Sequence, residues 1–494
     1  MLLSLILEKL LKDRENSSSV SYRVFGDERP EKIEIEEITC SSKKCRRESI
    51  FVCIKGARRD GNDFLDEAKA FGTRVFLSER KDIKLDSGIL IISNNARKSM
   101  AEIAKILFPV PKGAMITVGV TGTKGKSTVC ELLSKTLRKL GIITLSVGTL
   151  GAYCKEKIEL ENTTPDSSLL YPLIRRAYES GARACVIEVS SQALKDKRVY
   201  GIEFDIVAFT SFGIDHIGRG EHSSLGEYLA AKRQLFTSYG AKLAVVNYDD
   251  PYSAFFSAGI REVIRAGSAK GADFKIQNIK NGFFGMTFSL CGINRSFSLS
   301  GRFNATNIGI AAAIAERITK KPLSLILDIM SKIRVKGRFE CRSIRSRFAI
   351  IDYAHNEKSL TELLLSIREL SKKNIIAVFG SVGERSKNRR RELSRVASSL
   401  ADFSVITSDN PGTESPYEIA EEIYSNFASH EKAKIIIDRR DAIRYAFSIS
   451  QPGDIILLLG KGHEEYMLEG EKRVKFSERE VLFEIKKYGI PGIV

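Results

Sequence analysis

Several features that would restrict the class of protein are missing from this 494-residue sequence. Its eight cysteines are scattered without a Cys-x-x-Cys pair, so neither a zinc site nor a disulfide framework is indicated, and a reducing cytoplasmic location is expected. No apolar run approaches the ~20 residues that a membrane-spanning helix needs. The apolar first residues lack the basic start and cleavage site of a signal peptide, and they predict an amphipathic helix instead. These absences predict a soluble protein.

The charge, in contrast, is strongly one-sided, with a formal net charge of +17 at pH 7. Such a charge suits a polyanionic partner, which could be nucleic acid, a membrane surface or a nucleotide-linked metabolite, and it also fits a generally basic surface. Lysine and arginine are spread along the chain, and the only dense basic run, 386–392, is interpreted as a solvated helix start. The charge alone does not choose between these partners.

Strand-like and helix-like runs alternate along the chain, which predicts an α/β protein. At roughly 150 residues per domain, the length suggests three domains. Two prolines and a glycine in FPVPKGA indicate one boundary, and the alternation restarts after RVKGRFE, which indicates another. We therefore predict an N-terminal α/β domain (1–111), a central doubly wound P-loop ATPase-like domain (112–333) and a smaller, Rossmann-like C-terminal α/β domain (334–494).

The segment TGTKGKST (121–128) joins an apolar strand to an amphipathic helix. Backbone N–H groups at a helix start bind anions, and glycines let the backbone come close to phosphate oxygens. Lys126 is placed to neutralise outer phosphates, and the Ser127 hydroxyl is placed to ligate magnesium. The common pattern has a glycine where this chain has Val120, so the loop is a variant. The alternative is a glycine-rich turn capped by Ser127.

Other candidate site residues follow predicted strands, where α/β folds bind their ligands. Glu188 ends the run ACVIEV, and His216 follows the run FDIVAFT, so both are candidate magnesium ligands. Each alone could be solvated or structural. Asp352 and His355 of DYAH, and the segment GKGHEE (460–465), follow strands of the third domain. The clustering predicts an active site between domains.

The phosphate loop and ten motifs that follow it in order resemble those of the Mur ligase family over roughly residues 40 to 490. The ten motifs are NTTPD, EVSS, DHIG, YLAAKRQLF, NYDD, GRFNATN, GRFE, DYAH, SDNPGTE and GKGHEE. The resemblance implies an ATP-dependent amide ligase of peptidoglycan synthesis, which phosphorylates the free carboxylate of a UDP-muramoyl peptide so that an amino acid's amine displaces the phosphate. The DNP and GKGHE segments imply the member that adds the third-position amino acid to UDP-N-acetylmuramoyl-L-alanyl-D-glutamate.

The resemblance also implies roles for individual residues, with Mg²⁺ as cofactor and ATP as substrate. The catalytic residues would be Lys126, Glu188, His216 and Lys232. The magnesium ligands would be Ser127, Glu188, His216 and Lys232, the last as a carbamate, although from the sequence alone Lys232 is an ordinary helix lysine. The ATP-binding residues would be Gly122, Thr123, Lys124, Gly125, Lys126, Ser127, Thr128, Asn304, Asn307, Arg338, Asp352 and His355. The UDP-muramoyl dipeptide would contact Ser42, Asn162, Thr163, Thr164, Ser190 and Arg198. The incoming amino acid would contact Asp409, Asn410, Gly412, Gly460 and Glu464.

The sequence departs from the family pattern at several of these places. Ser41 and Lys43 stand where aspartate and arginine are common, and Gln192 and Ser211 also replace the usual residues. Gly412 follows DNP directly, where members that add meso-diaminopimelate typically carry an arginine whose planar fork binds the distal carboxylate. We therefore expect L-lysine or another diamine such as L-ornithine to be added, and not meso-diaminopimelate.

Two alternatives remain beside this ligase hypothesis. One is a catalytically silent or differently specific paralogue, which the substitutions keep open. The other is a folylpolyglutamate synthase-like ligase, which the N-terminal region and the DNP and GKGHE segments disfavour. The presence of Lys126, Glu188, His216 and Lys232 favours an active enzyme. We expect it to be a cytoplasmic monomer with no nucleic-acid partner and no membrane partner.

Overall fold

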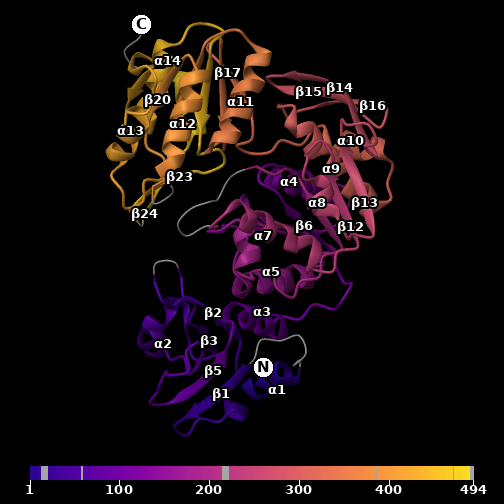
Figure 1. Ribbon diagram of the computed structural model, residues 1–494, viewed down its shortest axis with the longest axis vertical. Coiled ribbons are helices and arrows are strands. Elements are labelled where there is room, and N and C mark those ends of the chain that lie inside the picture. Colours follow the sequence, from indigo (N-terminus) through magenta and orange to yellow (C-terminus); the bar gives the residue numbers. More distant parts are fainter. Residues whose placement is uncertain (13–19, 57–58, 214–221, 384–386, 471, 490–494) are drawn as a thin grey trace.

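A computed structural model describes residues 1–12, 20–56, 59–213, 222–383, 387–470 and 472–489. Three α/β domains follow one another along the long axis of the molecule, with the N-terminal domain at one end and the C-terminal domain at the other (Figure 1). Each is built on its own sheet. None of the helices in these ranges combines the length and the apolar character that a bilayer crossing requires.

The N-terminal domain contains a five-stranded sheet. Its strands are β1 (Val20–Phe25), β2 (Glu37–Thr39), β3 (Ser49–Val52), β4 (Val75–Ser78) and β5 (Gly88–Ser93). Its helices are α1 (Leu3–Lys12), α2 (Leu65–Ala70) and α3 (Ala96–Leu107), with 3₁₀ turns η1 (Pro30–Lys32), η2 (Ser42–Lys44) and η3 (Gly61–Phe64). The strand order is β1-β5-β4-β3-β2, and only the β1–β5 pair is antiparallel. The amphipathic helix expected at the start of the chain is α1, which buries Leu3, Ile6, Leu7 and Leu10.

The central domain contains an eleven-stranded sheet. Its strands are β6 (Ile116–Thr121), β7 (Thr144–Gly148), β8 (Gly151–Tyr153), β9 (Lys157–Ile158), β10 (Ala184–Glu188), β11 (Ile206–Phe209), β12 (Leu243–Asn247), β13 (Glu262–Gly267), β14 (Phe274–Gly282), β15 (Gly285–Leu290) and β16 (Ile293–Phe297). Its helices are α4 (Lys126–Lys139), α5 (Ser167–Glu179), α6 (Ser191–Lys195), α7 (Leu225–Thr237), α8 (Ser253–Ser257), α9 (Phe303–Thr319) and α10 (Leu323–Met330).

The middle of this sheet is parallel and doubly wound, as the sequence predicts. The strand order is β16-β15-β14-β13-β12-β11-β6-β10-β7-β8-β9, and all pairs from β14 to β7 are parallel. Helices α4, α9 and α10 pack on one face, whereas α5 to α8 pack on the other. Antiparallel strands at both edges, β15–β16 and β8–β9, were not anticipated. The N-terminal domain joins this body through α3, which packs against α5.

The C-terminal domain contains a six-stranded sheet and a separate two-stranded hairpin. Its strands are β17 (Glu340–Ile344), β18 (Arg347–Asp352), β19 (Ile375–Phe379), β20 (Phe403–Ile406), β21 (Ala433–Ile435), β22 (Ile455–Leu459), β23 (Tyr466–Glu469) and β24 (Lys472–Lys475). Its helices are α11 (Glu357–Leu370), α12 (Lys387–Leu400), α13 (Pro416–Tyr424), α14 (Arg439–Ile449) and α15 (Glu478–Tyr488), with the 3₁₀ turn η4 (His430–Lys432).

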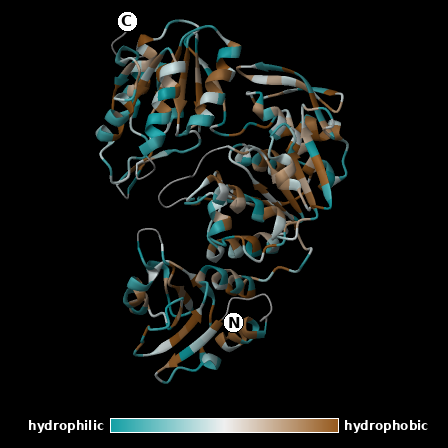
Figure 2. Cartoon of the chain, viewed as in Figure 1, coloured by the Kyte–Doolittle hydropathy of each residue, from teal (hydrophilic) through white to brown (hydrophobic). Residues whose placement is uncertain are grey.

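This sheet has the order β17-β18-β22-β19-β20-β21, and only its β17–β18 pair is antiparallel. Helices α11 to α13 pack on one face, and α14 and α15 pack on the other. Because both faces are covered, inner strands such as β22 are apolar throughout (Figure 2). The interpretation of the basic run as solvated is wrong at Arg390. That side chain is only 2% exposed and pairs with Glu414 at 2.6 Å and Glu422 at 2.8 Å.

Candidate active site

The predicted phosphate loop lies between β6 and the first residue of α4, Lys126. Gly122 and Gly125 have φ values of +148° and +89°, a backbone region that side chains disfavour. A Cβ at Gly122 would lie 2.1 Å from the Thr210 hydroxyl, and one at Gly125 would lie 2.4 Å from the side-chain oxygen of Asn307. Both glycines are therefore required by the packing of this loop. The helix start that follows leaves backbone N–H groups for an anion.

Two residues that directly follow β11, Thr210 and Ser211, form hydrogen bonds with the phosphate loop. The Thr123 backbone N–H donates to the Ser211 carbonyl at 2.6 Å, and the Lys124 N–H donates to the Ser211 hydroxyl at 3.1 Å. The Thr210 hydroxyl donates to the Lys124 carbonyl. The side chain of Ser211, which replaces the asparagine common in the family, thus keeps a hydrogen bond to the loop.

Two lysines converge on a single carbonyl of the loop. Lys126 Nζ donates to the Gly122 carbonyl at 2.9 Å and to the Thr123 carbonyl at 3.1 Å. Lys232, from α7, is 1% exposed and donates to the same Gly122 carbonyl at 2.9 Å. Its ammonium lies 4.5 Å from the centre of the Tyr228 ring. The two ammonium groups make this end of the loop strongly cationic, which favours an anionic ligand.

Glu188, at the end of β10, is buried next to the loop and collects hydroxyl and amide donors. Its carboxylate accepts from Ser127 Oγ at 3.0 Å and from the Thr149 backbone N–H at 3.0 Å. Burial raises the pKa of Glu188, while Lys126 and Arg338 oppose that rise. Thr149 was missed by sequence reasoning, although it follows the end of β7 and is therefore a strand-end residue of the same kind. Ser127 and Glu188 are hard oxygen donors of the type that Mg²⁺ prefers.

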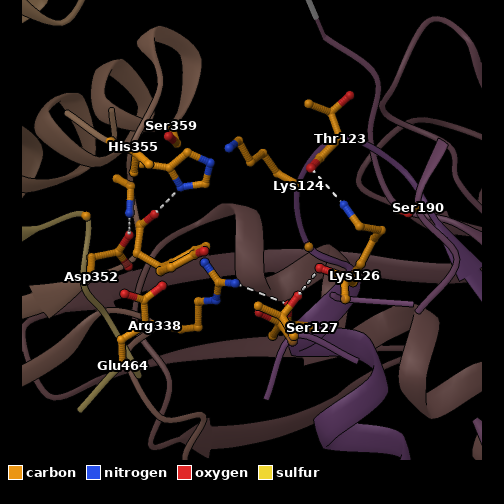
Figure 3. Close-up of a pocket in the computed structure, with 18 of the residues that line it drawn as sticks. Thr123, Lys124, Lys126, Ser127, Ser190, Arg338, Asp352, His355, Ser359 and Glu464 are labelled. Carbon is orange, nitrogen blue, oxygen red and sulfur yellow. Dashed lines mark hydrogen bonds between the residues drawn. The ribbon is translucent and has the colours of Figure 1, made fainter. Parts of the chain in front are cut away.

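The opposite wall comes from the segment that leads into the C-terminal domain and from the end of β18. Arg338 donates to Ser127 Oγ at 3.1 Å, and its guanidinium lies 4.8 Å from the centre of the Tyr353 ring. Asp352 accepts from the Phe339 N–H at 2.7 Å, and burial raises the pKa of this carboxyl against the effect of Arg338. Nδ1 of His355 lies 2.7 Å from the Tyr353 carbonyl. Figure 3 shows this wall facing the phosphate loop.

A buried lysine organises the part of the C-terminal domain predicted to hold an amino acid. Lys461 is fully buried and donates to the Asn410 side-chain oxygen at 2.7 Å and to Glu464 at 2.8 Å. Asn410 also donates to Glu464 at 2.9 Å, and Asp409 lies 3.8 Å from the Lys461 ammonium. Two carboxylates against one ammonium leave this wall with a net negative charge. Lys461 belongs to the quoted GKGHEE segment, yet the sequence alone assigned it no role.

These walls enclose a cavity of about 510 Å³. The predicted residues that line it are Thr123, Lys124, Gly125, Lys126, Ser127, Thr128, Asn162, Thr163, Ser190, Arg198, Lys232, Asn307, Arg338, Asp352, His355, Asp409, Asn410, Gly460 and Glu464. Further lining residues that the sequence did not single out include Thr149, Tyr353 and Tyr466. The structure therefore brings most of the predicted set together at one cavity between the central and C-terminal domains.

The remaining predicted residues lie elsewhere. Gly122 belongs to the loop itself without lining the cavity, Glu188 accepts from the loop residue Ser127 at 3.0 Å, and Asn304 accepts from the Asn307 side chain at 2.9 Å. The Thr164 hydroxyl donates to the Glu188 carbonyl at 2.6 Å. Ser42, in the N-terminal domain, donates to Glu67 at 2.6 Å and does not line this cavity, so its contact with a UDP group stays a prediction.

Gly412 is not part of the cavity wall either; its backbone pairs with Glu469, and its carbonyl accepts from the Gly470 N–H at 2.9 Å. His216 lies outside the described residues. Within the described ranges, no group of three or more histidine, cysteine, aspartate or glutamate side chains is arranged to hold a metal ion.

Comparisons with known proteins cover nearly the whole chain. Three family descriptions match in order: "Mur ligase family, catalytic domain" at residues 34–111, "Mur ligase middle domain" at 120–315, and "Mur ligase, glutamate ligase domain" at 337–462. A protein from Listeria innocua named UDP-N-acetylmuramoyl-L-alanyl-D-glutamate--2,6-diaminopimelate ligase is 34% identical over 470 residues, which are 92% of this chain and 95% of that protein.

Solved structures give the same result for the fold. A structure described by the same ligase name has a TM-score of 0.63 at 25% identity and covers 93% of this chain and 96% of its own. A MurF ligase from Thermotoga maritima in complex with ADP has a TM-score of 0.61 at 19% identity and covers 92% of this chain and 98% of its own. The three-domain arrangement described above is thus shared with both.

Proposed function

Because the chain belongs to the Mur ligase family, we propose that it adds the third amino acid of the peptidoglycan stem to UDP-N-acetylmuramoyl-L-alanyl-D-glutamate. As a member of this family, it is an ATP-dependent ligase that forms an amide bond in peptidoglycan synthesis. The proposed reaction transfers the terminal phosphoryl group of ATP to the free carboxylate of the UDP-linked dipeptide. The amine of the incoming amino acid then attacks the acyl carbon, and phosphate leaves.

The observation that carries this proposal is the cationic loop that opens on a cavity between two domains. Lys126 and Lys232 place two ammonium groups at the loop, and Arg338 adds a guanidinium from the other wall. These cations would neutralise the triphosphate of ATP and the charge that develops during phosphoryl transfer. The remaining rate enhancement would come from alignment of the reactants between the two walls of the cavity, since the reaction needs no side-chain nucleophile.

The donors around Glu188 fit a magnesium ion. The Ser127 hydroxyl and the Glu188 carboxylate are already adjacent, at 3.0 Å, and both are hard oxygen donors. A carbamate on Lys232 would add further oxygen ligands and convert a buried cation into an anion, and His216 is the remaining proposed ligand. When bound, the ion would supply charge neutralisation at the phosphate oxygens. The protein's own contribution is to hold these ligands beside the phosphate loop.

We assign the other cavity residues by the same reasoning. Asn304, Asn307, Arg338, Asp352 and His355 would surround ATP, and the stacked Arg338–Tyr353 pair gives that end a flat, cationic surface. The dipeptide would lie toward Asn162, Thr163, Ser190 and Arg198, which line the cavity on the central-domain side. The domain boundaries at 111/112 and 333/334, the monomeric state and the cytoplasmic location remain predictions.

For the amino acid, we propose a diamine without a distal carboxylate. The wall formed by Asp409, Asn410, Lys461 and Glu464 carries a net negative charge, which favours a side-chain ammonium. Gly412 cannot provide the guanidinium fork that would hold a second carboxylate. The name of the Listeria innocua relative points to 2,6-diaminopimelate instead. The proposal therefore concerns a difference between this chain and proteins about one-third identical to it.

An amino-acid panel tests the proposal. The protein is incubated with ATP, magnesium and UDP-N-acetylmuramoyl-L-alanyl-D-glutamate, and phosphate release is followed after adding L-lysine, L-ornithine or meso-diaminopimelate separately. We expect release with a diamine and formation of the corresponding tripeptide product. Release that requires meso-diaminopimelate would refute the specificity and leave the ligase activity in place. No release with any amino acid would favour a catalytically silent paralogue.

A further inference from the structure

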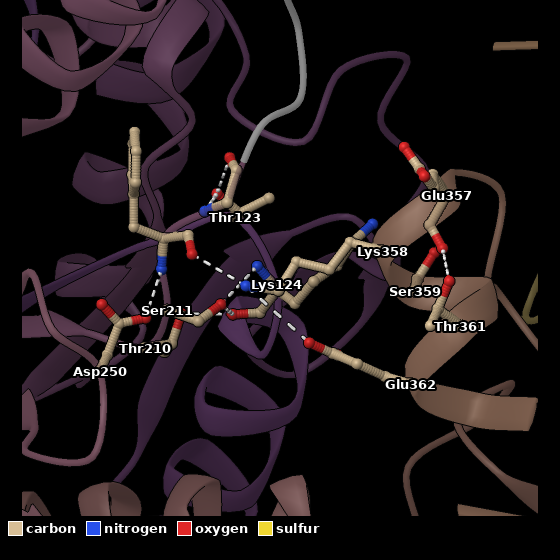
Figure 4. Close-up of polar contacts among 12 residues, drawn as sticks. Thr123, Lys124, Thr210, Ser211, Asp250, Glu357, Lys358, Ser359, Thr361 and Glu362 are labelled. Atoms are coloured by element: carbon tan, nitrogen blue, oxygen red, sulfur yellow. Dashed lines mark hydrogen bonds and ion pairs between the residues drawn. The ribbon is translucent and has the colours of Figure 1, made fainter. Parts of the chain in front are cut away.

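A lysine of the C-terminal domain contacts the segment of the central domain that is hydrogen-bonded to the phosphate loop. Lys358, the second residue of α11, donates from Nζ to the Phe212 carbonyl at 2.8 Å (Figure 4). Gly213 leaves the space for it, because a Cβ at that position would lie 2.6 Å from Lys358 Cδ. Neither residue belongs to a motif that indicated a role in the sequence.

The acceptor carbonyl belongs to a hydrogen-bonded segment of the central domain. The Phe212 N–H donates to Asp250 at 2.8 Å, which fixes the same residue from the opposite side. The next residue, Gly213, donates its N–H to the Thr123 hydroxyl at 3.1 Å. Thr123 is a residue of the phosphate loop. Lys358 therefore contacts a peptide that is hydrogen-bonded directly to the loop, and movement of α11 would be transmitted to it.

Lys358 occupies a position in α11 that is electrostatically unfavourable for a cation. The helix begins with a capping box formed by Asn356 and Ser359, so Lys358 lies in the first turn. A cation in the first turn is disfavoured by the helix dipole. Glu362, one turn later, lies 3.8 Å from the Lys358 ammonium, and Lys358 and Lys124 oppose the burial that raises the pKa of this glutamate. The same carboxylate thus interacts with lysines from both domains.

A second contact between the two domains is apolar and lies at a different place. Phe283, in the turn between β14 and β15, stacks on Phe348 of β18 with ring centres 4.4 Å apart and an angle of 12°. Phe283 also packs against the core of the C-terminal domain. This contact depends on shape and not on charge. If the Lys358 contact is lost, the domains remain attached at the aromatic stack. Closure at the phosphate loop is then weaker, because it depends on the remaining contacts there, such as that of Arg338 with Ser127 at 3.1 Å.

We propose that Lys358 is a positioning residue that holds the C-terminal domain closed over the phosphate loop through the Phe212 carbonyl. Closure brings Arg338 and the proposed amino-acid wall to the loop, so the contact should affect the step that joins the reactants. The proposal rests on the reaction proposed for this cavity. Its structural half, the separation of the two domains, can be measured on the protein without any substrate.

The test compares three variants of the full-length protein. Lys358→Met keeps the length of the side chain and removes the donor, whereas Lys358→Arg keeps a donor. Lys372→Met is the matched control, because Lys372 is an exposed lysine of the same domain. We expect kcat of Lys358→Met to fall roughly tenfold, the size that fits loss of one partly exposed charged hydrogen bond. Lys358→Arg should retain most of the rate, and the control should match the wild type.

Small-angle X-ray scattering of the same proteins separates this role from a purely structural one. Lys358→Met should show a larger radius of gyration than the wild type, with an unchanged circular dichroism spectrum. Gly213→Ala, which displaces the lysine without altering α11, should give the same two changes and covers the case in which Lys358→Met folds poorly. Wild-type turnover in Lys358→Met, or slow turnover with unchanged scattering in both variants, would overturn the proposal. If no amino acid supports turnover in the wild type, the scattering comparison still decides the structural half.

Discussion

Replacement of Gly412 tests the chemical reasoning behind the proposed amino-acid specificity. Gly412 has a φ of +62°, so any other L-residue is strained there by about 1–2 kcal/mol. Its carbonyl also accepts a hydrogen bond from Gly470, which ties it to the β23–β24 hairpin. Gly412→Ala introduces the strain alone, whereas Gly412→Arg introduces the strain together with a guanidinium. A comparison of the two variants therefore isolates the guanidinium.

The expected size of the change follows from these terms. Hydrogen bonds to charged groups contribute about 1.5–3 kcal/mol each, and a bidentate arginine–carboxylate pair makes two of them. Strain and the cost of ordering the long side chain reduce that gain. Relative to Gly412→Ala, we expect Gly412→Arg to raise the ratio of kcat/KM for meso-diaminopimelate over L-lysine by about 10- to 100-fold, which corresponds to about 1.4–2.8 kcal/mol.

The assay is phosphate release with each amino acid, at saturating ATP and UDP-linked dipeptide. Thermal unfolding of both variants supplies the control, because each should lose similar stability from the strained backbone. A wild-type enzyme that already prefers meso-diaminopimelate would refute the reasoning. So would a Gly412→Ala variant that shifts the preference as much as the arginine does, since the guanidinium would then be irrelevant.

Three further predictions concern the phosphate loop, Lys232 and the histidine of the GKGHEE segment. Lys126→Ala should abolish turnover, and a near-normal rate in the phosphate-release assay would remove the loop from the mechanism. Lys232→Ala should lose activity that added short carboxylates partly restore by supplying oxygen ligands, and full activity without them would exclude the carbamate. Burial, followed by nearby cations, lowers the pKa of His463 to about 3, so the unfolded chain binds the additional proton below about pH 6.5. The free energy of unfolding should therefore fall with falling pH by up to ~1.4 kcal/mol per pH unit. In urea unfolding from pH 4.5 to 7.5, His463→Gln should show a weaker pH dependence than the wild type. Identical pH dependences of the two proteins would contradict this prediction.

The parallel strands were predictable because each is a short apolar run that must be covered on both faces. β10, β12, β19 and β22 all coincide with such runs. The antiparallel edge of the central sheet was not predictable. β14 bears no continuous apolar run, because seven of its nine residues are at least partly exposed, in an irregular pattern. Its partners are fixed by pairing with β13 and β15, and such tertiary contacts override local propensity.

Arg390 shows a second limit of sequence reasoning. Its neighbours in the basic run gave no sign that it would be buried, because the two glutamates that compensate its charge lie 24 and 32 residues away in the chain. Burial of an arginine is tolerated only when such partners are present. A local run of charged residues predicts a solvated surface. Only the folded structure shows which of these charged side chains is buried.

The site was predictable to the extent that its residues follow strands or belong to short motifs. Lys126, Glu188 and Asp352 were found in that way. No role was assigned to Lys461 or Thr149, because their importance depends on what they contact. Lys461 donates a hydrogen bond to Glu464, and the Thr149 N–H donates one to Glu188. Lys358 is the extreme case, since its acceptor is 146 residues away and is a backbone carbonyl. No residue type marks such a position in a sequence.

The charges of the cavity explain why contacts outside the phosphate loop must hold its walls together. Lys126, Lys232 and Arg338 converge on the phosphate loop, and Glu188 is the acid beside them. Before an anion binds, these cations repel one another and oppose closure. The contact of Phe283 with Phe348 carries no such repulsion, and Lys358, although itself a cation, is held by the Phe212 carbonyl and by Glu362. A triphosphate would reverse the sign of the interaction, so ATP should act both as the phosphoryl donor and as the anion that draws the two walls together.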